Sequence, residues 1–122
     1  MRAPMGPLLS FKEKYLSRVL SGEKRATIRL GVVRPRFQLV YITCCGMIYG
    51  EAVITGVQYA KLKELGSEVL REDGFNSLEE ALEELKSLYP KIEPDSVVSV
   101  LRFALLRKYE KPVPLEVLRK KN

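Results

Sequence analysis

A chain of 122 residues can bury one hydrophobic core, and a composition of 46% hydrophobic and 30% charged residues excludes a disordered chain. No apolar run reaches the length of a membrane span, and residues 1–11 lack the apolar core of a secretion signal, so we expect a cytoplasmic protein. Nine basic and two acidic side chains lie in residues 1–50, five and eleven in 51–96, and seven and two in 97–122. If the two basic ends meet, they form a surface suited to a phosphate backbone; otherwise these charges only solvate the surface.

The first half of the chain predicts one helix and three or more strands. An extended start at residues 8–11 leads into an amphipathic helix over 12–21, which Gly22 ends as a left-handed cap. Residues 26–30 alternate as a strand, with Thr27 and Arg29 on the face opposite the apolar side chains. Residues 38–59 are rich in β-branched and aromatic side chains and predict a hairpin, 38–44 with 48–59, bulged near Gly56.

The second half predicts helices followed by a strand. Residues 61–74 form short helical turns, and a helix over 77–89 begins at a capping box of Ser77 and Glu80. The apolar run 96–106 predicts a central strand, and residues 107–122 a basic C-terminal extension with one helical turn near its end. This order favours an α+β fold in a single domain spanning 1–122, a small β-barrel or strongly curved mixed sheet flanked by helices.

The two cysteines, Cys44 and Cys45, are adjacent in a predicted strand, where alternation points them to opposite faces. We therefore expect no disulfide between them. The chain has no histidine and no further cysteine, so we expect no transition metal. Because neither a Walker loop nor a dinucleotide fingerprint is present, we expect no cofactor.

The stretch SGEKRATIRLG, residues 21–31, holds the candidate site. A turn after Gly22 lets the Lys24 amine swing to the side of the Thr27 hydroxyl, with Arg29 further along that face. Neighbouring positive charge and partial burial lower the pKa of a lysine, and a neutral amine can activate a threonine. The sequence REDG, residues 71–74, supplies a carboxylate. The alternative is structural: a capped helix end and an exposed strand face whose arginines pair with the acidic middle of the chain.

These residues resemble a known family. GEKRATIR resembles the G-x-K-x-x-T-x-R signature of the ASCH domain, a PUA-like β-barrel module. The helix before it, the stretch REDGFNSLEEALEELKSLYP and the closing strand VVSVLRFAL extend the resemblance over residues 8–103. The resemblance implies a PUA-like barrel that binds RNA or a modified nucleoside in a cleft between barrel and helices.

Some small bacterial ASCH members deacetylate acetylated cytidine with a lysine, a threonine and a glutamate. The resemblance places the first two on Lys24 and Thr27. Distance from the Tyr-Pro helix end places the glutamate on Glu72, with Asp73 and Glu68 as alternatives. Arg29 matches the signature arginine, to which we assign recognition of an anion or carbonyl.

Our first expectation is an RNA- or nucleotide-binding domain. Two groups of side chains serve it, arginines for phosphate and tyrosines for stacking on a base: Arg25, Arg29, Arg34 and Arg36, and Tyr41, Tyr49 or Tyr59. The alternative is an amidohydrolase acting on an acylated nucleoside, in which Thr27 attacks, Lys24 accepts its proton and Glu72 assists. A third interpretation is a protein-interaction module that uses the acidic helix 77–89.

Overall fold

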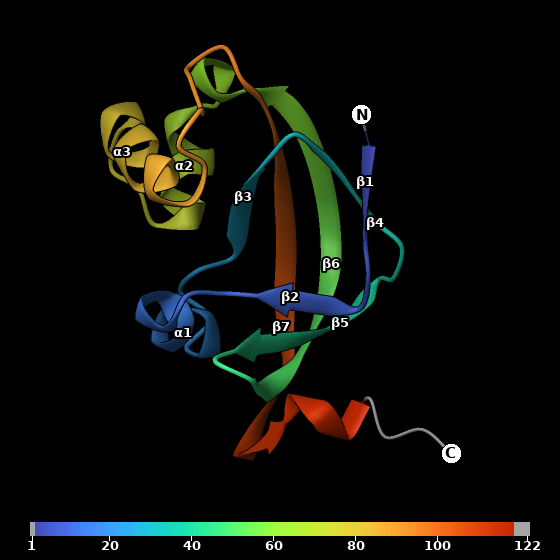
Figure 1. Cartoon of the computed structure of the whole chain (residues 1–122). Helices are drawn as coiled ribbons and strands as arrows, with labels where there is room; N and C mark the ends of the chain where they lie inside the picture. The colour runs from blue at the N-terminus through green and yellow to red at the C-terminus, as the bar shows by residue number, and fades with distance from the viewer. Residues whose placement is uncertain (1, 119–122) are drawn as a thin grey trace.

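The computed structural model describes residues 2–118 (Figure 1). Its strands are β1 (Arg2–Met5), β2 (Leu8–Ser10), β3 (Ala26–Leu30), β4 (Val32–Pro35), β5 (Leu39–Cys44), β6 (Met47–Lys61) and β7 (Val97–Pro114). Its helices are α1 (Glu13–Leu20), α2 (Ser67–Asp73) and α3 (Leu78–Leu88), with 3-10 turns η1 (Leu62–Glu64) and η2 (Leu115–Leu118). Within this range, no helix is long and apolar enough to cross a membrane.

The strands form one large mixed sheet and one small sheet. The large sheet has the order β2-β5-β6-β7-β3, with β2 parallel to β5 and the other neighbours antiparallel. The small sheet pairs β1 with β4 in parallel. The predicted α+β class is confirmed, and the predicted curvature lies in the long, bent β6 and β7 (Figure 1). The predicted barrel does not close, because the end strands β2 and β3 do not pair with each other.

Strand β7 is longer than predicted. Residues 107–114, expected as the start of a separate extension, continue β7 and pair with the first part of β6, where Met47 lies opposite Pro114. Charged and proline residues in this segment hide the strand from a hydrophobicity pattern. The expected helical turn appears as η2, while residues 119–122 lie outside the described part.

Two glycines shape the bend of β6. Register shifts occur on both sides of Gly50 and again next to Gly56, as the sequence predicted for Gly56. At Gly50 a Cβ atom would overlap the backbone carbonyl oxygen of Arg107 in β7, whereas at Gly56 it would meet open space. Gly50 therefore permits a close approach of the two backbones that no other residue allows.

Two hydrophobic clusters lie along the sheet. The first packs α2 and α3 against β3 and β7, through Ala26, Ile28, Leu62, Leu65, Leu70, Phe75, Ala81, Leu85, Ile92, Val98 and Val100. The second packs α1 against β2, β5, β6 and β7, through Leu9, Phe11, Val19, Val40, Ile42, Ala52, Ile54, Leu101 and Phe103. Burial of these side chains supplies the main driving force for the fold.

The helix ends follow the sequence signals with one difference. Gly22 has φ +83° and ends α1 as predicted. The Ser77 hydroxyl accepts a hydrogen bond from the Glu80 amide at 3.1 Å and caps α3. The Glu80 carboxylate accepts from the Asn76 side-chain amide at 3.4 Å, so the capping box forms only in part.

The expectation for the cysteines is wrong. Cys44 and Cys45 form a disulfide at the tip of the β5–β6 hairpin. Strand β5 ends at Cys44, and Cys45 lies in the turn with φ +58°, followed by Gly46 at +80°. Because Cys45 is outside the strand, side-chain alternation does not separate the two sulfur atoms.

Candidate functional site

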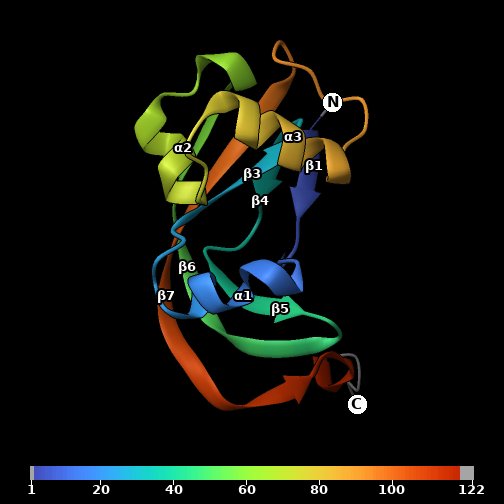
Figure 2. The same ribbon diagram turned by 90° about the vertical axis from the view of Figure 1, so that its left-hand side faces the viewer.

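A pocket of about 260 Å³ is lined in part by residues of both hydrophobic clusters. Strand β3, which contributes to its wall, lies between α1 and α3 (Figure 2). The residues that line the pocket come from β2, α1, β3, α2 and α3 and from the segments that join them. They are Ser10, Phe11, Lys12, Tyr15, Lys24, Thr27, Ile28, Arg29, Asp73, Phe75, Glu84, Leu85, Leu88 and Tyr89. The structure thus brings Lys24, Thr27 and Arg29 together in one pocket.

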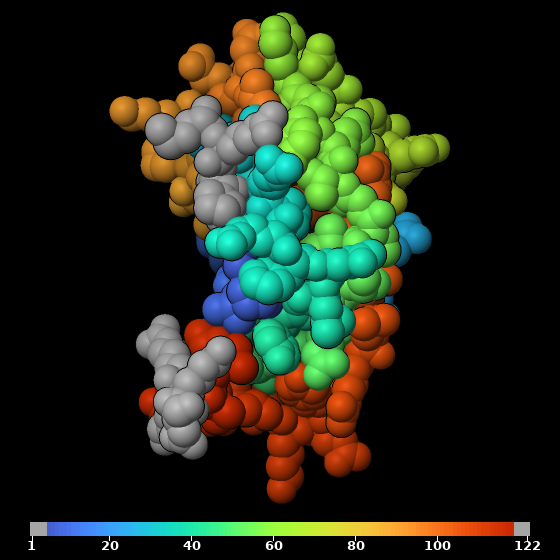
Figure 3. Space-filling model, turned by 90° about the vertical axis from the view of Figure 1, so that its right-hand side faces the viewer, coloured from blue at the N-terminus to red at the C-terminus, as the bar shows by residue number. Residues whose placement is uncertain are grey.

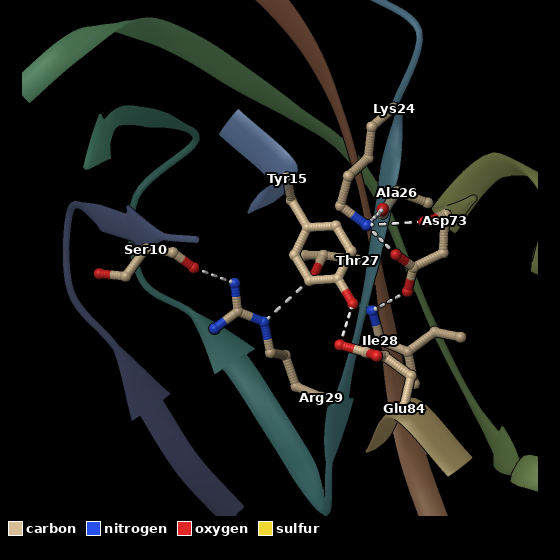
Figure 4. A network of polar contacts seen from close by, with 9 residues as sticks. All are labelled: Ser10, Tyr15, Lys24, Ala26, Thr27, Ile28, Arg29, Asp73 and Glu84. Carbon is tan, nitrogen blue, oxygen red and sulfur yellow. Dashed lines mark hydrogen bonds and ion pairs between the residues drawn. The ribbon is translucent and has the colours of Figure 1, made fainter. Parts of the chain in front are cut away.

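The Lys24 side chain is 4% exposed and is held by three acceptors (Figure 4). Its Nζ donates to the backbone oxygens of Ala26 and Asp73, each at 3.0 Å, and forms an ion pair with the Asp73 carboxylate. An ammonium group has three N–H donors, so these contacts use all of them. The amine is therefore fixed at the wall of the pocket.

Asp73, and not Glu72, is the carboxylate beside Lys24. Asp73 is buried, and its second oxygen accepts a hydrogen bond from the Ile28 amide at 2.9 Å. Glu72 lies outside the pocket, where its carboxylate accepts from Arg102 Nε at 3.1 Å. Glu68, the other alternative, is an exposed residue of α2 and does not line the pocket.

Burial lowers the pKa of the Lys24 amine from its usual 10.5 to about 7. The positive charges of Arg29 and Arg18 act in the same direction, whereas a carboxylate such as Asp73 favours the charged amine. The direction agrees with the expectation from the sequence, although the main cause is loss of water and not the neighbouring charges.

Thr27 and Arg29 form a second polar group on the same wall. Arg29 Nε donates to the Thr27 hydroxyl oxygen at 3.2 Å, and Nη2 donates to the Ser10 carbonyl oxygen at 2.7 Å. The guanidinium carbon also lies 5.8 Å from the centre of the Phe11 ring. Because the Thr27 oxygen accepts from Arg29, its own O–H can donate to a ligand. The remaining Arg29 N–H groups have no partner among residues 2–118.

Aromatic side chains form the other walls of the pocket: Phe11, Tyr15, Phe75 and Tyr89. The Tyr15 hydroxyl donates to the Glu84 carboxylate, which also pairs with Lys14 at 2.6 Å. Burial and the bond to Glu84 raise the pKa of Tyr15. Lys24 Nζ lies 5.3 Å from the centre of the Tyr15 ring, within the range of a cation–π contact.

Several predicted binding residues lie elsewhere. Arg25, Arg34 and Arg36 are exposed, and none lines this pocket. Gly31, with φ +84°, reverses the chain after β3, so β4 and the segment after it carry Arg34 and Arg36 away from the pocket. The three tyrosines considered for stacking, Tyr41, Tyr49 and Tyr59, do not line this pocket either.

Sequence reasoning missed the aromatic walls. Tyr15 has the spacing of a core position on α1, and Tyr89 follows the last turn of α3, so each fits a purely structural role. The one available signal was the repeated proximity of an aromatic residue to the motif elements: FK before α1, DGF after α2 and YP after α3.

Solved structures show what this fold is similar to. The ASCH protein from Zymomonas mobilis aligns with a TM-score of 0.71 over 94% of this chain and 77% of its own, at 14% identity. The ASCH domain from Lactobacillus crispatus JV V101 aligns with a TM-score of 0.68 over 86% and 80%, at 17% identity. The N-terminal domain of Staphylothermus marinus McrB aligns with a TM-score of 0.56 over 98% and 80%, at 12% identity.

No family model matches the sequence, and no curated protein matches it significantly. The open mixed sheet with its helices defines a small α+β domain (Figure 1). In particular, the chain has the fold of ASCH domains, as the resemblance of its sequence implied.

Proposed function

We propose that this protein binds an RNA nucleotide or a modified nucleoside with the base in the pocket beside β3. The observation that carries the proposal is the combination of aromatic walls with unused hydrogen-bond donors on Thr27 and Arg29. The volume, about 260 Å³, lies just below the range of small-molecule sites, which span roughly 300–1,000 Å³. A flat, polar-edged ring such as a nucleobase suits such a pocket.

The polar groups of the pocket include donors and an acceptor for hydrogen bonds to a ligand. Arg29 and Thr27 present donors, so they fit a carbonyl or phosphate oxygen of the ligand. The Glu84 carboxylate lies on the other side of the pocket as an acceptor, held by Tyr15. Lys24 and Asp73 satisfy each other, so their contribution is to fix the wall that carries Thr27.

Calorimetric titration with the nucleosides and nucleoside monophosphates of RNA tests this proposal. Arg29→Gln removes a charged donor and is expected to weaken binding about tenfold or more, since a hydrogen bond to a charged group contributes roughly 1.5–3 kcal/mol. Thr27→Val removes the second donor at constant shape. Arg25→Gln is the matched control, because Arg25 belongs to the same stretch but is exposed outside the pocket.

Two results would oppose the proposal. One is the absence of binding of every nucleoside and nucleotide by the folded wild-type protein. The other is an affinity that falls as much in Arg25→Gln as in Arg29→Gln, which would place the ligand outside the pocket.

A second function, hydrolysis of an amide on an acylated nucleoside, is favoured by one observation. A buried lysine with a pKa near 7 lines the same pocket as a buried threonine. In this reaction Thr27 attacks the carbonyl carbon, Lys24 accepts the hydroxyl proton and Arg29 stabilises the oxyanion. Lys24 returns that proton to the leaving amine as the C–N bond breaks, and a water molecule then hydrolyses the acyl-threonine ester, which releases the carboxylic acid and restores Thr27. Asp73 takes the place first assigned to Glu72, because it is the carboxylate in contact with Lys24.

Incubation with acetylcytidine tests the enzyme. The rate is expected to rise with pH through about 7, where the Lys24 amine loses its proton, and to vanish in Thr27→Val. Absence of turnover by the wild-type protein from about pH 6 to about pH 10, a range that brackets a depressed lysine pKa, would leave binding as the only function proposed for the pocket.

A further inference from the structure

A second candidate binding surface, basic and partly aromatic, lies away from the pocket, on the side of the molecule shown in Figure 3. There the chain segment after β3 lies over the middle of β6. We define the arginine–aromatic surface by its exposed residues Arg34, Arg36, Phe37, Val57 and Tyr59. Phe37 is 47% exposed and Tyr59 45%, so both rings present apolar area to solvent on this surface.

The charge of this surface has one sign. Residues 31–40 and 52–61, which build it, contain Arg34, Arg36 and Lys61 and no acidic residue. Among the described residues, no carboxylate forms a salt bridge with either arginine. Unpaired arginines beside an exposed aromatic ring attract a ligand that carries both negative charge and flat apolar faces.

The surface is also hollowed beside Phe37. A shallow depression of about 310 Å³ is lined on one side by Arg36 and Phe37 and on the other by Gly56 and Val57 of β6. Gly56 has open space where a side chain would be, and the bulge next to it interrupts the register with β7. A planar group can therefore lie on the strand backbone beside the Phe37 ring.

We propose that the arginine–aromatic surface binds single-stranded RNA, with phosphates on Arg34 and Arg36 and a base stacked on Phe37. A single strand supplies both the phosphates and the exposed base faces that this surface fits. This proposal rests on the proposed function, because it takes RNA as the ligand. It adds that the partner is a polynucleotide strand, which contacts a surface separate from the base pocket. This surface contacts the phosphate backbone of the RNA and stacks on a base without selecting a base sequence.

Fluorescence anisotropy with a labelled oligouridylate, measured at several salt concentrations, tests the proposal. The double variant Arg34→Gln/Arg36→Gln is expected to lower affinity at least tenfold near 0.1 M salt. It should also reduce the slope of log affinity against log salt by about 1.4, since each phosphate contact to a single strand contributes about 0.7. Phe37→Ala should weaken binding about 5- to 150-fold through loss of stacking and leave the slope unchanged.

The matched control is Lys86→Gln/Lys91→Gln, which removes the same charge from two exposed positions, one in α3 and one in the turn after it. An equal loss of affinity in this control would overturn the proposal, because binding would then follow net charge alone. Wild-type affinity in both surface variants would overturn it as well. A wild-type dimer that Phe37→Ala dissociates without a change in RNA affinity would show that the surface joins two copies of the chain, and this too would overturn it.

The two proposals fail separately. Loss of nucleotide binding in Arg29→Gln tests the pocket, and the oligouridylate slope in Arg34→Gln/Arg36→Gln tests the surface. If no mononucleotide binds but the slope changes as expected, the surface proposal holds and the pocket proposal fails. If mononucleotides bind and the slope does not change, the reverse is true.

Discussion

Glu72 and Asp73 are neighbours in the sequence, but the structure gives them opposite surroundings. Asp73 is buried against Lys24 and the Ile28 amide, whereas Glu72 is partly exposed against Arg102. Adjacent residues of a helix point about 100° apart, so one turns to the pocket and the other away. Distance along the sequence locates the helix end but does not resolve which of two adjacent carboxylates faces inward.

This difference predicts unequal costs of removing each charge. Below about pH 7, where Lys24 keeps its charge in the folded protein, Asp73→Asn leaves the ammonium buried without its counter-ion and is expected to lower the free energy of unfolding by about 3–5 kcal/mol. Glu72→Gln breaks a partly exposed pair and should cost at most about 1 kcal/mol. Urea unfolding of both variants measures the difference, and similar losses would contradict the burial of the Lys24–Asp73 pair.

The lowered pKa of Lys24 predicts a pH dependence of stability. Between about pH 7, the folded pKa, and 10.5, the usual value, the unfolded chain carries more protons on Lys24 than the folded one. The free energy of unfolding should therefore rise with pH across this window, by at most about 1.4 kcal/mol per unit. Below pH 7 this contribution no longer changes.

Urea unfolding at pH 7, 8 and 9 measures that slope. The control is the double variant Lys24→Met/Asp73→Asn, which removes both buried charges and should show no rise attributable to this site. A slope of the same size in the double variant would assign the effect to other groups.

At the level of elements, the close crossing of β6 and β7 depends on one glycine. Gly50→Ala places a methyl group on the Arg107 carbonyl oxygen, a backbone atom that cannot turn aside, and we expect a loss of about 1–3 kcal/mol or more. Gly56→Ala, in the same strand but with open space around it, should change stability by less than about 0.5 kcal/mol. Thermal and urea unfolding compare the two, and equal effects would show that the strands do not approach closely at Gly50.

Sequence patterns predicted the elements whose side chains follow a regular period. Helix α3, with its cap and leucine stripe, and strand β3, with Ala26 and Ile28 on its buried face, were identified this way. Strands β1 and β4 were missed. Each has four residues and contains a proline, and their pairing depends on two segments about 30 positions apart. Such pairing leaves no local period.

At the scale of the whole molecule, the C-terminal half of β7 extends the sheet along the first residues of β6, at the turn end of the β5–β6 hairpin. A chain shortened after Leu106 loses the partner of β6 from Met47 to Glu51 and should unfold at a clearly lower temperature or fail to fold. A chain shortened after Leu118 keeps all of β7 and should unfold close to the full chain. Calorimetry of the two truncations measures this, and equal midpoints would mean that residues 107–114 are dispensable.

In the candidate site, too, local sequence patterns predict some residues and not others. The motif stretch predicted that Lys24, Thr27 and Arg29 lie close together, and all three line the pocket, because a short turn and one strand relate them. The remaining walls come from α1, α3 and the segment after α2, whose approach depends on the packing of both hydrophobic clusters. No spacing in the sequence encodes that approach, so the aromatic character of the pocket appears only in three dimensions.

The Lys24–Asp73 pair also forms hydrogen bonds with backbone groups on the unpaired edge of β3. Strand β3 lies at the end of the sheet, yet the Ala26 carbonyl accepts from Lys24 and the Ile28 amide donates to Asp73. Side chains thus occupy backbone groups that would otherwise be open to a strand of another molecule, a common start of aggregation. The protein that loses this pair should therefore not only unfold more easily but also self-associate while still folded, with its β3 edges facing each other.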